Sequence, residues 1–82
     1  LHIATATIGL ELSLPFIERR VLAALEALLG HPIGNLRKEA ALALGELADP
    51  ASAQALRVAE GDGDPEVRKA VRIALAQLRV PA

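Results

Sequence analysis

Apolar residues in the second half of the chain recur with the spacing of one face of an α-helix. In the segment 36–47 they occupy positions 36, 40, 43, 44 and 47, and in the segment 67–78 they occupy positions 67, 71, 74, 75 and 78. Both sets follow the pattern i, i+4, i+7, i+8, i+11, which is typical of a helix that packs one face against its neighbours. Both segments are therefore predicted to be amphipathic helices.

The segment 36–47 aligns with the segment 67–78 at a constant offset of 31 residues, without a gap. The length of the repeat is therefore 31 residues. The basic pair Arg37-Lys38 recurs as Arg68-Lys69 at this offset, and the glycine that precedes each helix recurs as well. Any amphipathic helix has the apolar spacing, but register and basic pair together indicate a true internal repeat. Each unit is predicted to be a first helix, a glycine stop, a turn and a second helix.

Capping residues suggest where these helices begin. The expected helix starts lie at Ser13, Asn35, Asp49-Pro50 and Asp64-Pro65. We expect a repeat domain over 13–82, with repeats at about 14–48 and 49–80. The segment 1–12 loosely echoes 44–47 and is interpreted as a remnant helix of a preceding repeat.

The second helices carry apolar residues beyond one stripe, such as Leu42 and Ile73. A helix of this kind must be covered on several sides, which stacked repeats achieve and a lone helix pair does not. The predicted fold is all-α, an α-α superhelix (a helical-repeat solenoid) of about two and a half repeats, with Leu44 and Leu75 among the most buried residues. About three repeats are usually needed for stability. We therefore expect either a longer array or self-association through the apolar N-terminal end.

Composition excludes several kinds of function. The formal net charge is −1 and the pI about 6.1, so no global field attracts nucleic acid or anionic lipid. The sequence contains no cysteine, which excludes disulfides, thiolate metal sites and a cysteine nucleophile. No apolar run approaches the roughly 18 residues of a membrane-spanning helix, and the N-terminal stretch lacks a signal-peptide pattern. We expect a cytoplasmic protein that does not act at a membrane.

The start of the last predicted helix resembles a known family. Its motif is Asp62-x-Asp64-Pro65-x-Val67-Arg68, followed by Ala-Leu at 74–75. This motif, and the similar 36–45 segment, is similar to the short HEAT-like repeats of the phycobilisome-lyase type over about residues 14–80. The resemblance implies a helical-repeat fold and leaves the activity open, because such repeats occur in scaffolds, enzyme regulators and a few enzymes.

In HEAT-like families an aspartate before the second helix often binds the arginine of a neighbouring repeat, forming a ladder. The arginines are present in both repeats here. His31 and Ile33 occupy the positions that match Asp62 and Asp64, so only the second repeat has both the arginine and the aspartates of the ladder. The candidate partner-binding or inter-repeat ladder residues are Arg37, Lys38, Asp64, Arg68, Lys69, Arg72 and Arg79.

Two interpretations of these residues stay open. The basic pairs either form the ladder, through Asp64, or line an anion-binding surface, and the ladder is favoured because cations at helix N-termini oppose the helix dipole. The stripe Arg68, Arg72, Arg79 either supplies the polar outer face that closes a helical stack or binds an acidic partner. Closure of the stack is favoured.

No residue cluster indicates catalysis. His2 and His31 are isolated, and the chain has neither a glycine-rich phosphate loop nor a Gly-x-Ser-x-Gly motif. The acidic residues between 60 and 66 lack the spacing of a calcium-binding loop and are interpreted as solvated capping carboxylates. We predict a protein without enzymatic activity, metal or cofactor that serves as a protein–protein interaction or scaffold module. The alternative is an accessory domain of an enzyme or a lyase-like or chaperone-like factor; nucleic-acid binding is less favoured because no aromatic residue can stack on bases.

Overall fold

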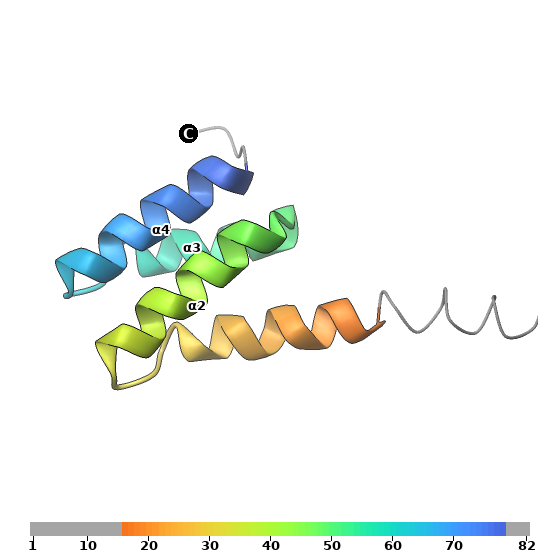
Figure 1. The fold of residues 1–82 in the computed structure, drawn as a ribbon, viewed down its shortest axis with the longest axis horizontal. Helices are drawn as coiled ribbons and strands as arrows, with labels where there is room; N and C mark the ends of the chain where they lie inside the picture. The colour runs from red at the N-terminus through yellow and green to blue at the C-terminus, as the bar shows by residue number, and fades with distance from the viewer. Residues whose placement is uncertain (1–15, 79–82) are drawn as a thin grey trace, which may run out of the picture.

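The computed structural model describes residues 16–78, which form helices joined by short turns (Figure 1). These residues contain no strand. The helices are a first helix over 16–28, α2 (Gly34–Leu47), the 3₁₀ helix η1 (Pro50–Ser52), α3 (Ala53–Ala59) and α4 (Pro65–Leu78). The prediction of an all-α helical repeat is confirmed. The predicted remnant helix over 1–12 and the predicted cap Ser13 lie outside the described residues.

The two second helices, α2 and α4, lie side by side and run in the same direction (Figure 1). The 16–28 helix runs antiparallel to α2 and lies on the side of α2 away from α4, while α3 lies behind the pair (Figure 1). Helix α2 begins at Gly34 and α4 at Pro65, which are equivalent positions of the repeat. Two helix pairs are therefore stacked, as a solenoid requires, and α2 and α4 are not the two arms of one hairpin.

The turns that precede α2 and α4 have the same hydrogen bond. The Ile33 amide donates to Nδ1 of His31 over 3.0 Å, and the Asp64 amide donates to Oδ1 of Asp62 over 2.9 Å. This bond fixes each turn, and the helix then begins one residue after the donor. The expectation that Asn35 caps α2 is wrong, because the turn starts the helix earlier and Ile33 occupies the N-cap position without a side-chain cap.

The two expected Asp-Pro helix starts are present in the structure. Oδ1 of Asp49 accepts a hydrogen bond from the Ala51 amide over 2.9 Å, and Oδ1 of Asp64 accepts one from the Glu66 amide over 2.9 Å. The first of these helices opens with the 3₁₀ turn η1 before α3 follows. Side-chain caps of this kind satisfy amides that have no partner within the helix.

Helices α2 and α4 approach each other closely over small side chains. Gly45 is buried, and a methyl group added to it would lie 2.7 Å from Cα and 2.9 Å from Cβ of Ala74. A contact this close allows the two backbones to pack without bulky side chains between them. The largest fully buried side chains of the surrounding core are Leu44, Leu56, Val67 and Val71.

The apolar pattern misjudged the burial of three leucines. Leu44 is fully buried as predicted, but Leu75 is only half-buried at the edge of the core. Leu36 and Leu47 lie on the apolar face of α2 and are nevertheless exposed. The reason is that these two leucines lie near the two ends of α2, whereas the buried residues of α2 lie between them, from Ala40 to Gly45.

One buried polar contact links the two repeats behind this core. The Ser52 side chain is fully buried and donates from Oγ to Oε2 of Glu26 over 3.1 Å. Burial of a hydroxyl is tolerated when it has such a partner. The contact ties the start of the second repeat to the 16–28 helix.

Candidate functional site

Arg37 forms an ion pair between the two repeats. Its Nε donates to Oδ2 of Asp62 over 2.8 Å, and its Nη2 donates to Oδ1 over 3.2 Å. Its remaining nitrogen, Nη1, donates to the carbonyl oxygens of His31 and Pro32 over 2.8 and 3.1 Å. A planar guanidinium matches a carboxylate in this two-bonded geometry better than any other cation does. Arg37 therefore joins the turn of its own repeat to the turn of the next.

The electrostatics of the pair agree with its geometry. The hydrogen bond from Arg37 is the main reason that the pKa of the Asp62 carboxyl lies below its ordinary value, and the Asp64 amide adds to the effect, while burial opposes it. The same bond raises the pKa of Arg37. Only 19% of the Arg37 side chain and 9% of the Asp62 side chain are exposed, so water screens the pair less than it screens a typical surface pair.

Asp62, and not Asp64, is the acidic partner in this ion pair. The sequence-based expectation assigned the bond to Asp64, whose carboxylate instead caps α4 through the Glu66 amide. The other Asp64 oxygen lies beside α2: a methyl group added to Gly34 would be 2.7 Å from Oδ2. The interpretation of Asp62 as a solvated capping carboxylate is also wrong, because this residue is enclosed by the ion pair.

Arg68 occupies the same place in the second repeat but has only part of this bonding. Its Nη1 donates to the Asp62 carbonyl over 2.8 Å, as Nη1 of Arg37 does to the His31 carbonyl. Its Nε and Nη2 have no hydrogen-bond partner among residues 16–78. Arg37 thus binds a carboxylate through Nε and Nη2, whereas the same two donors of Arg68 bind no residue in 16–78.

The other predicted residues lie on the surface of α2 and α4. Lys38 is half-buried, and Lys69 and Arg72 are exposed. Arg79 lies outside the described residues. None of these three described side chains forms an ion pair within residues 16–78. The predicted anion-binding surface stays a prediction.

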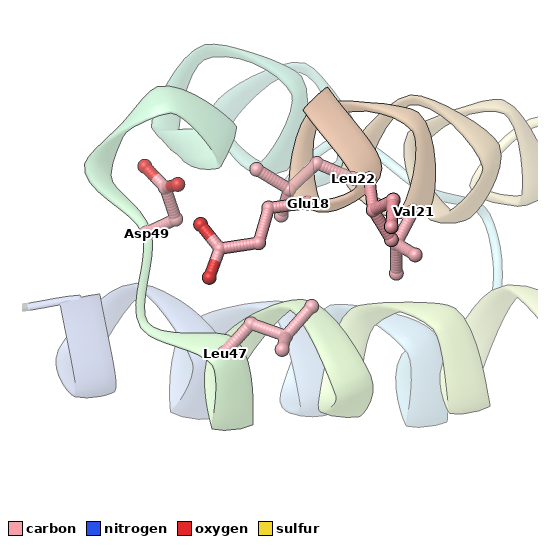
Figure 2. A pocket seen from close by; sticks show the side chains of 6 residues that line it. Glu18, Val21, Leu22, Leu47 and Asp49 are labelled. Carbon is pink, nitrogen blue, oxygen red and sulfur yellow. The ribbon is translucent and has the colours of Figure 1, made fainter. Parts of the chain in front are cut away.

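A small groove lies between the 16–28 helix and the end of α2 (Figure 2). Its volume is about 170 Å³. We call it the acidic groove. It is lined by Ile17, Glu18, Val21, Leu22, Leu47 and Asp49.

The acidic groove combines an apolar floor with two carboxylates. Val21 and Leu47 extend into it from the 16–28 helix and from α2 and are 44% and 51% exposed, and the buried Leu22 lies beside Val21 on the 16–28 helix (Figure 2). The carboxylates of Glu18 and Asp49 lie together at one end of the groove (Figure 2). Neither forms an ion pair with a residue in 16–78. The groove can hold an apolar side chain beside a positive charge.

No direct signal in the sequence pointed to this groove. Its residues come from three places in the chain, and Leu47 was assigned to the core because of its helical spacing. The exposed apolar residues of the first helix, Ile17 and Val21, would have been the only available sign. Three-dimensional packing decides which leucine of a stripe is covered.

Residues 16–78 contain no candidate metal centre. No group of three or more histidine, aspartate or glutamate side chains in this part of the chain is arranged to hold a metal ion. No buried side-chain polar atom of these residues lacks a hydrogen-bond partner. No helix among the described residues is long and apolar enough to cross a membrane.

Comparisons with curated protein sequences and with solved structures give no match. A family model described as HEAT repeats matches residues 3–76. The matched region covers the helices from 16 onward except the last two residues of α4, and it includes the Arg37–Asp62 ion pair. The chain therefore belongs to the HEAT repeat family.

Proposed function

We propose that this chain is a non-enzymatic protein-interaction module whose acidic groove receives an apolar side chain of a partner protein, next to a lysine or arginine of that partner. The observation that carries the proposal is the acidic groove itself. Surface apolar residues that are gathered around a hollow, and not scattered singly, mark interaction sites.

The size of the groove favours a side chain over a cofactor. Pockets for small molecules and cofactors typically measure about 300–1,000 Å³. The acidic groove, at about 170 Å³, is smaller than that range. It suits one aliphatic or aromatic anchor, of the kind that carries much of the energy of a protein interface. The size of the acidic groove therefore argues against a cofactor bound at this place.

The charge of the groove selects among partners. Glu18 and Asp49 repel phosphates, which disfavours nucleic acid and anionic lipid at this surface, and they attract a basic side chain. Without an ion-pair partner within residues 16–78, both are available to a partner's cation. A basic residue adjacent to the apolar anchor would be held at the end of the groove where the two carboxylates lie (Figure 2).

The narrower family assignment is also a proposal. The resemblance to the phycobilisome-lyase type of HEAT-like repeat is supported by the short repeat, in which Arg37 recurs as Arg68, and by the Asp-x-Asp-Pro-x-Val-Arg motif. Asp62 and Arg68 of that motif have structural roles here, in the ion pair and in the bond to the turn carbonyl. Those roles concern the stacking of repeats and carry no implication for a lyase activity.

A peptide selection tests the proposed function. Random peptides displayed on phage are selected on the immobilised chain, and the winners are made as labelled peptides for fluorescence anisotropy. We expect them to contain a large apolar residue next to lysine or arginine. Val21→Asp places a charge in the groove and should weaken binding about tenfold or more, because a buried unpaired charge is costly.

The matched control is Val58→Asp on α3. Val58 is 73% exposed and lies away from the acidic groove, so the same substitution adds the same charge without touching the site. It should leave binding within about twofold of the parent, a difference of under about 0.5 kcal/mol. Equal loss with both substitutions, or selected peptides without a basic residue, would refute the proposal.

A further inference from the structure

The outer face of α4 differs from the equivalent face of α2 at the positions that form the interface between repeats. On α2, Ala41 and Gly45 are buried, and Gly45 lies against Ala74 of α4. Arg72 and Ala76 occupy the matching positions of the repeat on α4, and both are exposed. A long charged side chain and an added methyl group at these places prevent another helix from approaching α4 as closely as α4 approaches α2. This face therefore does not suit a further repeat packed in the same way.

The same face carries an arginine that is already oriented for a carboxylate. Nη1 of Arg68 is held by the Asp62 carbonyl at 2.8 Å, the bond that also orients Arg37 through the His31 carbonyl. With Nη1 fixed in the same way, Nε and Nη2 of Arg68 present the pair of donors that Arg37 uses to bind Asp62. An oriented guanidinium loses less side-chain entropy on binding than a free one.

The charge of α4 also favours an acidic ligand at Arg68. Helix α4 contains three basic residues and a single acidic one, Glu66, whereas α2 contains two of each. Arg72 follows Arg68 by one helical turn and lies on the same side of the helix. The two guanidinium groups are therefore spaced to bind two acidic side chains of one segment.

We propose that Arg68 and Arg72 form a binding site for an acidic segment of another protein, in which Arg68 donates from Nε and Nη2 to an aspartate or glutamate carboxylate. This site lies on α4, separate from the acidic groove, and gives the interaction module of the proposed function a second surface. The geometry expected for Arg68 and that carboxylate is the geometry of the Arg37–Asp62 ion pair.

A second copy of the chain does not supply the missing carboxylate. The residue that matches Asp62 in the first repeat is His31, and its Nδ1 is already occupied by the Ile33 amide. A copy stacked head to tail would present this imidazole to Arg68. The partner is therefore a different, acidic chain. A single-stranded nucleic acid is disfavoured because α4 carries no aromatic side chain on which its bases could stack.

The test uses a fluorescently labelled peptide that alternates glutamate and serine, with a glutamine–serine peptide as the uncharged probe. Anisotropy titrations compare the parent chain with three variants: Arg68→Gln, Arg68→Lys and Lys69→Gln. Lys69→Gln is the matched control, since it removes the same charge from the adjacent exposed position. A labelled oligothymidylate serves as the phosphate probe. The Nε–H resonance of Arg37 reports whether the inter-repeat ion pair survives each substitution.

We expect the glutamate peptide to bind the parent, and the glutamine peptide and the oligothymidylate to bind at least about tenfold more weakly, the effect of losing charge-assisted hydrogen bonds. Arg68→Gln and Arg68→Lys should both weaken binding about tenfold, because lysine keeps the charge but not the paired donors. Lys69→Gln should change it by no more than about threefold, the contribution of one exposed charge. Equal effects of Arg68→Gln and Lys69→Gln, full binding by Arg68→Lys, or tighter binding of the oligothymidylate would overturn the proposal. The groove variant Val21→Asp should bind the glutamate peptide normally, so failure here is distinct from failure of the proposed function.

Discussion

Replacement of Leu44 by alanine should remove a large part of the stability of the fold. Leu44 is fully buried in α2 and belongs to the core that the two repeats share. Burial of a leucine side chain contributes about 1.5–3 kcal/mol by transfer from water alone. Because α2 and α4 are held together around this position, the space left by the side chain will not close completely, and the total cost should be about 3–5 kcal/mol.

Leu47→Ala is the matched control, on the same helix and one turn further along. Leu47 is 51% exposed, so about half of its area is already in water, and its truncation should cost about 1 kcal/mol. A domain of this length is stabilised by only about 4–12 kcal/mol. Leu44→Ala should therefore lower the midpoint of thermal unfolding by about 10 °C or more, and Leu47→Ala by a few degrees.

The two variants are compared by urea titration and thermal melting, both followed by the helical circular dichroism signal. Equal losses for the two leucines would refute the packing described here, because they would mean that the shared core does not enclose Leu44 more than Leu47. A larger loss for Leu47 would place the inter-repeat contact nearer the C-terminal end of α2.

Four further predictions concern single positions. Gly45→Ala should cost about 1–3 kcal/mol despite the better helix propensity of alanine, because the added methyl would meet the backbone of α4; urea titration measures this. Ala48→Gly should stabilise the chain by about 1 kcal/mol in the same assay, because residue 48 has a φ of 54° at the end of α2 and glycine adopts this conformation without strain. Asp62→Asn should flatten the acid limb of the stability profile: the pKa of this carboxyl is lowered in the folded chain, so the stability it contributes is present above about pH 4 and is lost as the pH falls through the folded-state pKa. A charge at Ile8 should weaken self-association in sedimentation velocity while Arg72→Glu leaves it nearly unchanged, and a strictly monomeric parent would contradict the expected contact through the N-terminal end.

The architecture could be predicted because its signals are local or periodic. The recurrence of Arg37-Lys38 as Arg68-Lys69 placed the two second helices in register, and α2 and α4 begin at positions related by the same offset. The Asp-Pro pairs marked the start of each helix of the second repeat, since a carboxylate next to a proline satisfies the first turn with few alternatives. The same offset predicted that the two second helices would be neighbours and not a hairpin.

The partner of Arg37 could not be predicted in the same way. The motif offers two aspartates, Asp62 and Asp64, and the sequence does not say which of them turns toward the preceding repeat. The turn decides it: Asp62 accepts the Asp64 amide and faces Arg37, while Asp64 faces the start of α4. The alignment of His31 with Asp62 was visible in the sequence, but its meaning depended on that turn.

The acidic groove was missed for a related reason. Periodicity identifies the apolar face of a helix but not the element that covers each part of it. Leu44 and Leu47 share one stripe of α2, yet one is fully buried and the other forms the edge of a groove. Glu18 and Asp49 come together at the groove because the 16–28 helix packs beside the turn that follows α2. No local sequence pattern encodes this packing.

The role of the acidic groove as a protein-binding site is tested most directly by nuclear magnetic resonance of the leucine and valine methyl groups. The methyl-labelled chain is titrated with a peptide from the phage selection. We expect the resonances of Val21, Leu22 and Leu47 to shift together and saturate at a common concentration, while those of Val58 stay in place. Shifts centred on Val58, or spread evenly over the methyl groups of the chain, would contradict the assignment of the acidic groove as the protein-binding site.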